Sequence, residues 1–195
     1  GVILTLDRTS LNVANFINDK KMKKLTVLLS VLILGVLLSV SAYSENTSAS
    51  DTFSVDLQEG NTFPVFTLET LNGKKISSSR AFDKNKKTLI VTAAEWCPDC
   101  HEELPVLEKF YRKNKNKYNF AVIFIERRSP EEKVKEYLSK EKFTFPVYFD
   151  YNSVFVEGTQ VKFVPTNIFI DKNGKITSVV AETISDENEF INRLK

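Results

Sequence analysis

Two cysteines with two residues between them stand in residues 95–101, EWCPDCH, which also hold the only histidine of the chain. This spacing suits half of a zinc site, a structural disulfide or a redox pair. A structural zinc site takes four ligands, commonly from two such pairs, and the sequence has no second pair. A disulfide between Cys97 and Cys100 would be a poor staple, because stabilisation grows with loop length. Both arguments favour a redox pair, and we expect no metal.

The motif stands where an apolar strand changes into a helix. Residues 87–96 contain a continuous apolar run, as in a strand buried on both faces, and a helical pattern follows from Pro98 to about Lys113. Pro98 suits the first helical position, where its missing N–H leaves no acceptor unpaired. Cys97 then lies at the helix start, where free N–H groups favour a thiolate. Cys100 faces inward one turn later, so Cys97 is expected to attack a partner disulfide and Cys100 to release the mixed disulfide.

Three neighbouring side chains bear on this pair. A carboxylate between the cysteines disfavours a thiolate, so Asp99 predicts a less oxidising centre than a histidine would give, although the helix end opposes this effect. Trp96 directly precedes the first cysteine and is expected to cover the site and contact partners. His101 either faces solvent or has a modest electrostatic influence on the thiols, and the sequence leaves both open.

Strands and helices alternate on both sides of the motif, which predicts an α/β fold with a central mixed β-sheet flanked by helices. Parallel strands joined by helices come first, and an antiparallel pair closes the sheet. Asn72-Gly73 and Asn173-Gly174 are turn signals within two expected hairpins. The expected elements beyond the motif are a hairpin over 63–76, a strand over 118–126, a helix beginning at Ser129 over 129–141, a strand over 145–150, a hairpin over 165–182 and a capped helix over 185–195.

The N-terminal part has the pattern of a secretory signal. Met22 is followed by two lysines and by an uncharged apolar run over 25–42, which ends in small residues. At ~1.5 Å per residue this run spans about 27 Å, which is marginal for a bilayer, so a cleaved signal and a short retained anchor both stay open. Exported proteins keep disulfides, and we therefore expect an extracytoplasmic location.

These patterns divide the chain into four expected parts. They are a non-native or over-extended N-terminus (1–21), a signal peptide or membrane anchor (22–42), a polar linker (43–52) and one folded domain (53–195). The formal charge is +2, but the excess of basic residues precedes the folded part, which is nearly neutral. Nucleic-acid binding is therefore not expected.

The stretch AEWCPDC and the later Val164-Pro165-Thr166 together resemble the thioredoxin superfamily. Over roughly residues 55–194 the wider pattern is similar to its exported ResA/TlpA-like branch. The resemblance implies a thioredoxin-like fold with an N-terminal hairpin and a helix–strand insertion before Pro165.

The same resemblance implies roles for individual residues. Cys97 matches the nucleophile and Cys100 the resolving cysteine. Pro165 matches a cis-proline that faces the disulfide, and Val164 before it offers backbone groups to an extended partner. Glu103 matches an acidic residue that handles the proton of the resolving cysteine, although a first-turn acid favoured by the helix dipole is an equal reading.

Three further positions bear on the subgroup. Pro105 matches the proline that kinks the active-site helix. Val91 stands where cytosolic thioredoxins have a buried Asp, and Ala94 stands where peroxidase relatives have Thr or Ser. The sequence therefore argues against both a cytosolic thioredoxin and a peroxidase.

The expected function is that of a monomeric thiol–disulfide oxidoreductase whose only redox group is the Cys97–Cys100 disulfide. It would reduce disulfides of exported proteins, and apocytochrome c is the best-known target in the family. A membrane thiol donor or acceptor would exchange electrons with it. Two alternatives stay open: a disulfide-forming oxidase of the same fold, and a non-catalytic binding or assembly module.

Overall fold

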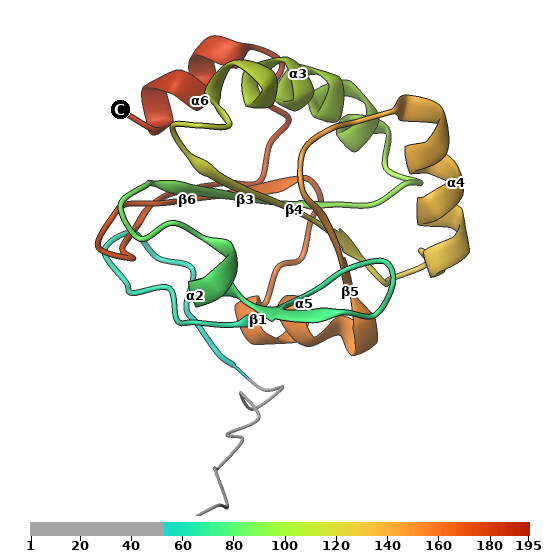
Figure 1. The fold of residues 1–195 in the computed structure, drawn as a ribbon, viewed down its shortest axis with the longest axis horizontal. Coiled ribbons are helices and arrows are strands. Elements are labelled where there is room, and N and C mark those ends of the chain that lie inside the picture. Colours follow the sequence, from blue (N-terminus) through green and yellow to red (C-terminus); the bar gives the residue numbers. More distant parts are fainter. Residues whose placement is uncertain (1–52) are drawn as a thin grey trace, which may run out of the picture. The chain divides into compact units, whose positions relative to one another are not determined.

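A five-stranded mixed sheet in the order β5-β4-β3-β6-β7 organises residues 53–195, which are the residues that the computed structural model describes (Figure 1). Strands β3, β4 and β5 are parallel, β6 is antiparallel to β3, and β7 is antiparallel to β6. The strand bounds are Thr88–Ala93 for β3, Asn119–Ile125 for β4, Val147–Asp150 for β5, Thr166–Ile170 for β6 and Ile176–Val180 for β7. The predicted α/β class and mixed sheet are confirmed.

Helices make the parallel connections. Helix α3 (Pro98–Asn114) joins β3 to β4, and α4 (Glu131–Glu141) joins β4 to β5. A two-stranded hairpin of β1 (Thr67–Glu69) and β2 (Lys75–Ser77) precedes the sheet, and α6 (Glu187–Arg193) ends the chain. The hairpin and the α4–β5 insertion lie where the sequence places them.

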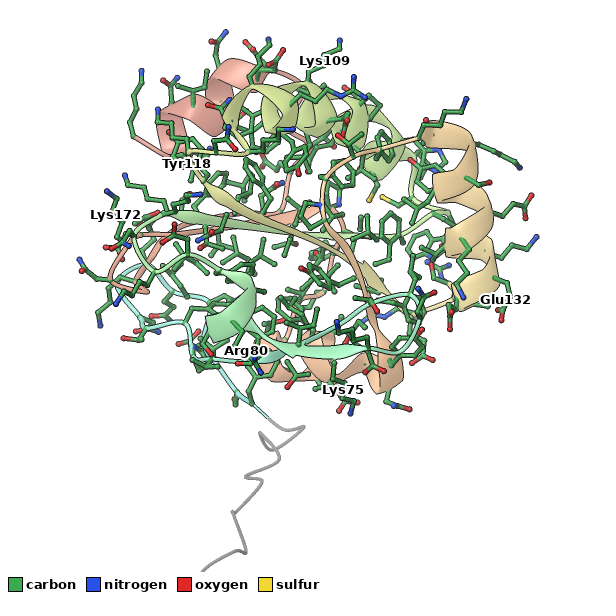
Figure 2. The ribbon with its side chains drawn as sticks, in the orientation of Figure 1. Lys75, Arg80, Lys109, Tyr118, Glu132 and Lys172 are labelled. Carbon is green, nitrogen blue, oxygen red and sulfur yellow. The ribbon has the colours of Figure 1, made fainter. Side chains whose placement is uncertain are left out.

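The period of two in the strands divides the apolar side chains between two cores. Leu89 and Val91 of β3 pack with α3 and α6, whereas Ile90 packs with the hairpin and the opposite face. Helices α3 and α6 lie on one face of the sheet, and α2 (Ser78–Ala81), β1 and α5 (Val154–Thr159) lie on the other (Figure 1). Figure 2 shows side chains filling the space on both faces, with labelled charged residues such as Lys109 and Glu132 pointing outward. Burial on both faces explains the continuous apolar runs of β3 and β4.

The start of α4 differs from the prediction. The helix begins at Glu131 with Pro130 as its N-cap residue, and no side chain caps it. The sequence predicts a start at Ser129, but this residue is fully buried and its hydroxyl donates to the Glu95 carboxylate. A long-range partner has therefore replaced the local cap.

Three short helices were not predicted: α2, a 3-10 turn η1 (Tyr151–Ser153) and α5. The Asp150 carboxylate accepts hydrogen bonds from the N–H groups of Phe155 (2.6 Å) and Val156 (3.0 Å), and so satisfies the start of α5. Within residues 53–195, no helix is long and apolar enough to cross a membrane. The predictions for 1–21, 22–42 and 43–52 lie outside the described residues.

Candidate active site

The sulfur of Cys97 lies at the beginning of α3. Cys97 is the N-cap residue, with an extended backbone (φ −89°, ψ 114°), and Pro98 occupies the first helical position. The Cys100 N–H donates a hydrogen bond to Cys97 Sγ over 3.1 Å. Both cysteines are free thiols in this structure. An N–H group and the positive end of a helix therefore face the sulfur atom that would carry charge in thiol–disulfide exchange.

A second segment approaches the same sulfur. The Val164–Pro165 peptide bond is cis, and the Cys97 thiol donates to the Val164 carbonyl oxygen over 3.3 Å. Val164 and Pro165 precede β6, which pairs directly with β3. Because β3 and β6 are neighbouring strands, the sheet brings the AEWCPDC stretch and the Val164-Pro165-Thr166 stretch together.

Cys100 is enclosed by the protein. Its side chain is fully buried. Burial raises the pKa of the Cys100 thiol, the hydrogen bond with Cys97 and the charge of Glu103 raise it further, and a hydrogen bond from the Ala94 backbone opposes them. If this thiol is to attack a disulfide, it therefore needs a group nearby that accepts its proton.

Glu103 is the buried carboxylate beside this thiol. It lies three residues after Cys100, on the same side of α3. Its Oε1 accepts a hydrogen bond from Asn167 Nδ2 (2.9 Å), and its Oε2 accepts one from the Ile184 N–H (2.7 Å). Burial raises the pKa of Glu103 to about 7, although both hydrogen bonds act to lower it. The side chain can therefore take up and release a proton near neutral pH.

Trp96 is tied to the loop before Pro165 through a third segment. Its Nε1 donates to the Arg127 carbonyl (3.0 Å), and the Arg128 guanidinium lies 4.1 Å from the centroid of its ring. Arg127 Nη1 in turn donates to the Lys162 carbonyl (3.3 Å). Next to Lys162, Phe163 is 68% exposed, and Trp96 is 36% exposed. Two exposed aromatic side chains thus adjoin the segments that hold Cys97.

The other positions in the motif have simpler surroundings. Asp99 is exposed in the first turn of α3. His101 is exposed too, but its ring stacks on Tyr137 with centroids 4.9 Å apart, and its Nε2 lies 2.5 Å from the Glu95 carbonyl oxygen. The sequence does not predict this packing against α4. Pro105 lies inside α3, as the resemblance implies.

Sequence reasoning missed Asn167. The residue is fully buried in β6, opposite Val91 of β3, and its amide contacts Glu103. The strand reads TNIFI and is buried at every position. A polar amide within such a strand needs a buried partner, and that signal was present in the sequence.

This fold and this cysteine pair define a thioredoxin-like oxidoreductase. The Redoxin family profile matches residues 58–193.

The thioredoxin-like protein YneN of Bacillus subtilis (strain 168) is 31% identical over 132 residues, which cover 67% of this chain and 76% of YneN. A thiol-disulfide oxidoreductase ResA of Bacillus cereus is 28% identical over 172 residues, 86% of this chain and 95% of that protein. The crystal structure of StoA from Bacillus subtilis matches with a TM-score of 0.59 at 21% identity, over 68% of this chain and 97% of StoA. The chain belongs to the Redoxin family, and it is an oxidoreductase of the ResA/TlpA-like branch of the thioredoxin superfamily.

The raised pKa of Glu103 predicts a pH-dependent effect of Glu103→Gln. The carboxyl has a pKa of about 7 in the fold against 4.5 as the ordinary value, so between these pH values the folded state holds a proton that the unfolded state has lost. The stability that wild-type Glu103 contributes therefore falls as the pH rises from 4.5 to about 7. In urea unfolding of the reduced protein, Glu103→Gln should be more stable than wild type at pH 8, by up to about 3 kcal/mol, and the difference should shrink toward zero near pH 4.

Glu108→Gln is the matched control, because Glu108 is a second largely buried glutamate on α3. Burial acts to raise the pKa of Glu108, but hydrogen bonds from Thr144 and Arg112 outweigh it and leave this pKa lowered. The stability that Glu108 contributes is present above its unfolded pKa and is lost as the pH falls. Glu108→Gln should therefore lower the free energy of unfolding at pH 8 and lower it less at low pH. If Glu103→Gln changed the free energy of unfolding equally at pH 8 and pH 4, burial would not be what raises the pKa of Glu103.

Proposed function

We propose that this chain is an extracytoplasmic thiol–disulfide oxidoreductase that reduces disulfides of exported proteins. The observation that carries the proposal is the order of the groups at the start of α3. The sulfur of Cys97, the N-cap residue, comes first. The buried thiol of Cys100 follows one turn later in α3, and the buried carboxylate of Glu103 follows about one turn after that. Reduction of a disulfide uses these three groups in that order.

In the first step the Cys97 thiolate attacks one sulfur of the partner disulfide. The Cys97–partner bond forms, the partner S–S bond breaks, and the second partner sulfur leaves as a thiolate that takes a proton. The Cys100 N–H and the start of α3 stabilise the attacking thiolate. Trp96 and Phe163 provide exposed aromatic surface for the partner chain.

In the second step the Cys100 thiol gives its proton to the Glu103 carboxylate. The Cys100 thiolate then attacks Cys97 Sγ in the mixed disulfide, and the Cys97–Cys100 bond forms as the Cys97–partner bond breaks. The released partner sulfur takes a proton. The partner has then gained two electrons and two protons, and the enzyme holds the disulfide.

The reducing direction is supported by the charge of Asp99, whereas Glu103 supports the exchange chemistry itself. A reductant must form the Cys100 thiolate from a thiol in every turnover, and burial makes that costly without an acceptor such as Glu103. When a thiol donor re-reduces the enzyme, Cys100 leaves as a thiolate and the same carboxyl can return the proton, so Glu103 serves exchange in either direction. Asp99 adds a negative charge between the two cysteines, which disfavours the thiolate that strong oxidants stabilise.

The partners and the location are part of the proposal. The signal-like pattern over 22–42 supports export, and export places the enzyme where proteins contain disulfides. Each turnover leaves the enzyme oxidised, so it needs a thiol donor, which we place in the membrane. No cofactor beyond the cysteine pair takes part in this scheme.

Replacing Cys100 by Ser should trap the substrate. The mixed disulfide on Cys97 then has no resolving thiol, so adducts with exported proteins should accumulate and be found by non-reducing gels and mass spectrometry. The Cys97→Ser chain is the matched control and should trap far less. Absence of adducts from Cys100→Ser, with full biological activity of Cys97→Ser, would favour a non-catalytic binding module.

The reduction potential of the pair tests the direction. We expect a value near or below about −250 mV, whereas a value near −120 mV is that of a strong oxidant. Asp99→His should make the potential less negative, because a cationic side chain favours the Cys97 thiolate. A wild-type potential close to the oxidant value would replace the reductase by the disulfide-forming oxidase.

The exposed ring of Phe163 is predicted to contact the substrate. Phe163→Ser should lower kcat/KM for a protein disulfide about tenfold and leave the reduction potential unchanged, since the lost contact is apolar and lies outside the cysteine pair. Val65→Ser is the control, because Val65 is a similarly exposed apolar residue (61%) that precedes the hairpin on the opposite face. Equal losses in both variants would show that the Phe163 ring has no specific contact.

A further inference from the structure

One buried side-chain atom in residues 53–195 has no hydrogen-bond partner, and it is Asn167 Oδ1. The other end of this amide, Nδ2, donates to Glu103 Oε1 over 2.9 Å. Both side chains are fully buried. An unpaired buried acceptor is unfavourable, so its presence directly beside a titrating carboxylate calls for a physical reason.

We propose that Asn167 is a positioning residue for proton transfer at Cys100, because its amide can hydrogen-bond to Glu103 in either protonation state by turning over. This inference rests on the proposed function for the role of Cys100. It adds a residue that neither the cysteine motif nor the resemblance identifies.

The two states differ in which amide atom faces Glu103. An ionised carboxylate only accepts, so Nδ2 faces Oε1 and Oδ1 is left unpaired, as observed. When Glu103 is protonated, its Oε2 still accepts from the Ile184 N–H, so the acid proton lies on Oε1. With the amide in its present orientation, that O–H would point at the Nδ2 donor of Asn167. A turn of the amide brings Oδ1 to the same position, where it accepts the proton of the acid.

An amide suits this task because its two ends have nearly the same shape and opposite hydrogen-bonding character. In each state one end contacts Glu103 and the other end lies unpaired, so the two states leave the same number of contacts. Glu103 can therefore exchange its proton without losing its bond to Ile184 or its place beside Cys100. An apolar side chain in β6 would bond to Glu103 in neither state.

The surroundings of Glu103 place the proton transfer between it and Cys100. Its titratable neighbours in the described part of the chain include Asp99 and Cys100 on α3 and Glu189 on α6. Glu189 is paired with Arg193 over 2.9 Å, and Asp99 is exposed. Cys100 is the thiol among these groups that must lose a proton, and Asn167 stabilises the carboxylate that receives it.

The test follows the Glu103 carboxyl in the reduced full chain by carbon-13 NMR, together with the side-chain amide signals of Asn167. Asn167→Leu, a variant of similar volume, loses the bond to Glu103 in both states. Because a hydrogen bond to an ionised carboxylate is stronger than one to the neutral acid, the Glu103 midpoint should rise by about one pH unit. The pH dependence of mixed-disulfide resolution, measured in a single turnover, should move by the same amount. Asn119→Leu removes another buried amide, one that bonds to Asp83 and Thr88, and should leave both midpoints unchanged.

Two results would overturn the inference. One is a folded Asn167→Leu whose Glu103 midpoint equals that of wild type. The other is wild-type Asn167 amide signals that do not follow the Glu103 titration, a measurement that stands even if the variant fails to fold. In a Glu103→Gln background, Asn167→Leu should no longer change the pH profile, and a remaining shift would also count against the proposal. The Glu103 carboxyl titration and the Asn167 amide signals are both measured on the protein alone. Absence of trapped substrates with Cys100→Ser would therefore reject the proposed function without changing either of these measurements.

Discussion

The hydrogen bond from the Cys100 N–H to Cys97 Sγ is the interaction on which the site depends. It requires a strand that ends just before Cys97 and a helix that begins just after it. Strand β3 meets the first condition because it is central in the sheet, bonded to β4 on one side and β6 on the other. Pro98 meets the second, because it begins α3 without leaving a donor unpaired. The cysteine pair is thus held between a strand paired on both sides and the first turn of a helix.

The sheet also decides which residues surround the pair. Because β6 runs antiparallel to β3, the residues before and within β6 lie beside the end of β3. Val164 contacts Cys97, and Asn167 reaches Glu103. Val91, where cytosolic thioredoxins have a buried acid, lies opposite Asn167. The buried carboxylate nearest the cysteines in sequence, Glu103, comes from α3 instead, and an amide from the neighbouring strand bonds to it.

The loop after β4 links the two sides of the site. Ser129 donates to Glu95, and Arg127 joins Trp96 to the backbone of Lys162. These contacts connect the segment before Cys97 with the segment before Pro165. A partner that docks on Trp96 and Phe163 would therefore meet a surface whose parts are already joined to one another.

The sequence by itself determined the fold class, the order of most elements and which two cysteines are the candidate redox pair. Continuous apolar runs mark strands buried on both faces, and Asn-Gly turns mark hairpins, because both signals act over a few neighbouring residues. The spacing of Cys97 and Cys100 is equally local. The resemblance extended this reading to Glu103 and Pro165.

Only the tertiary structure decided which distant groups meet. The Glu103–Asn167 bond joins residues 64 positions apart, and Ser129 bonds to Glu95 instead of capping α4. The short helix α5 begins where Asp150 satisfies its first N–H groups. Local patterns cannot predict such contacts, because their free energy comes from burial and from partners that only the folded sheet brings together. The cysteine spacing therefore marks the candidate redox atoms, whereas the fold decides which buried polar groups lie beside them.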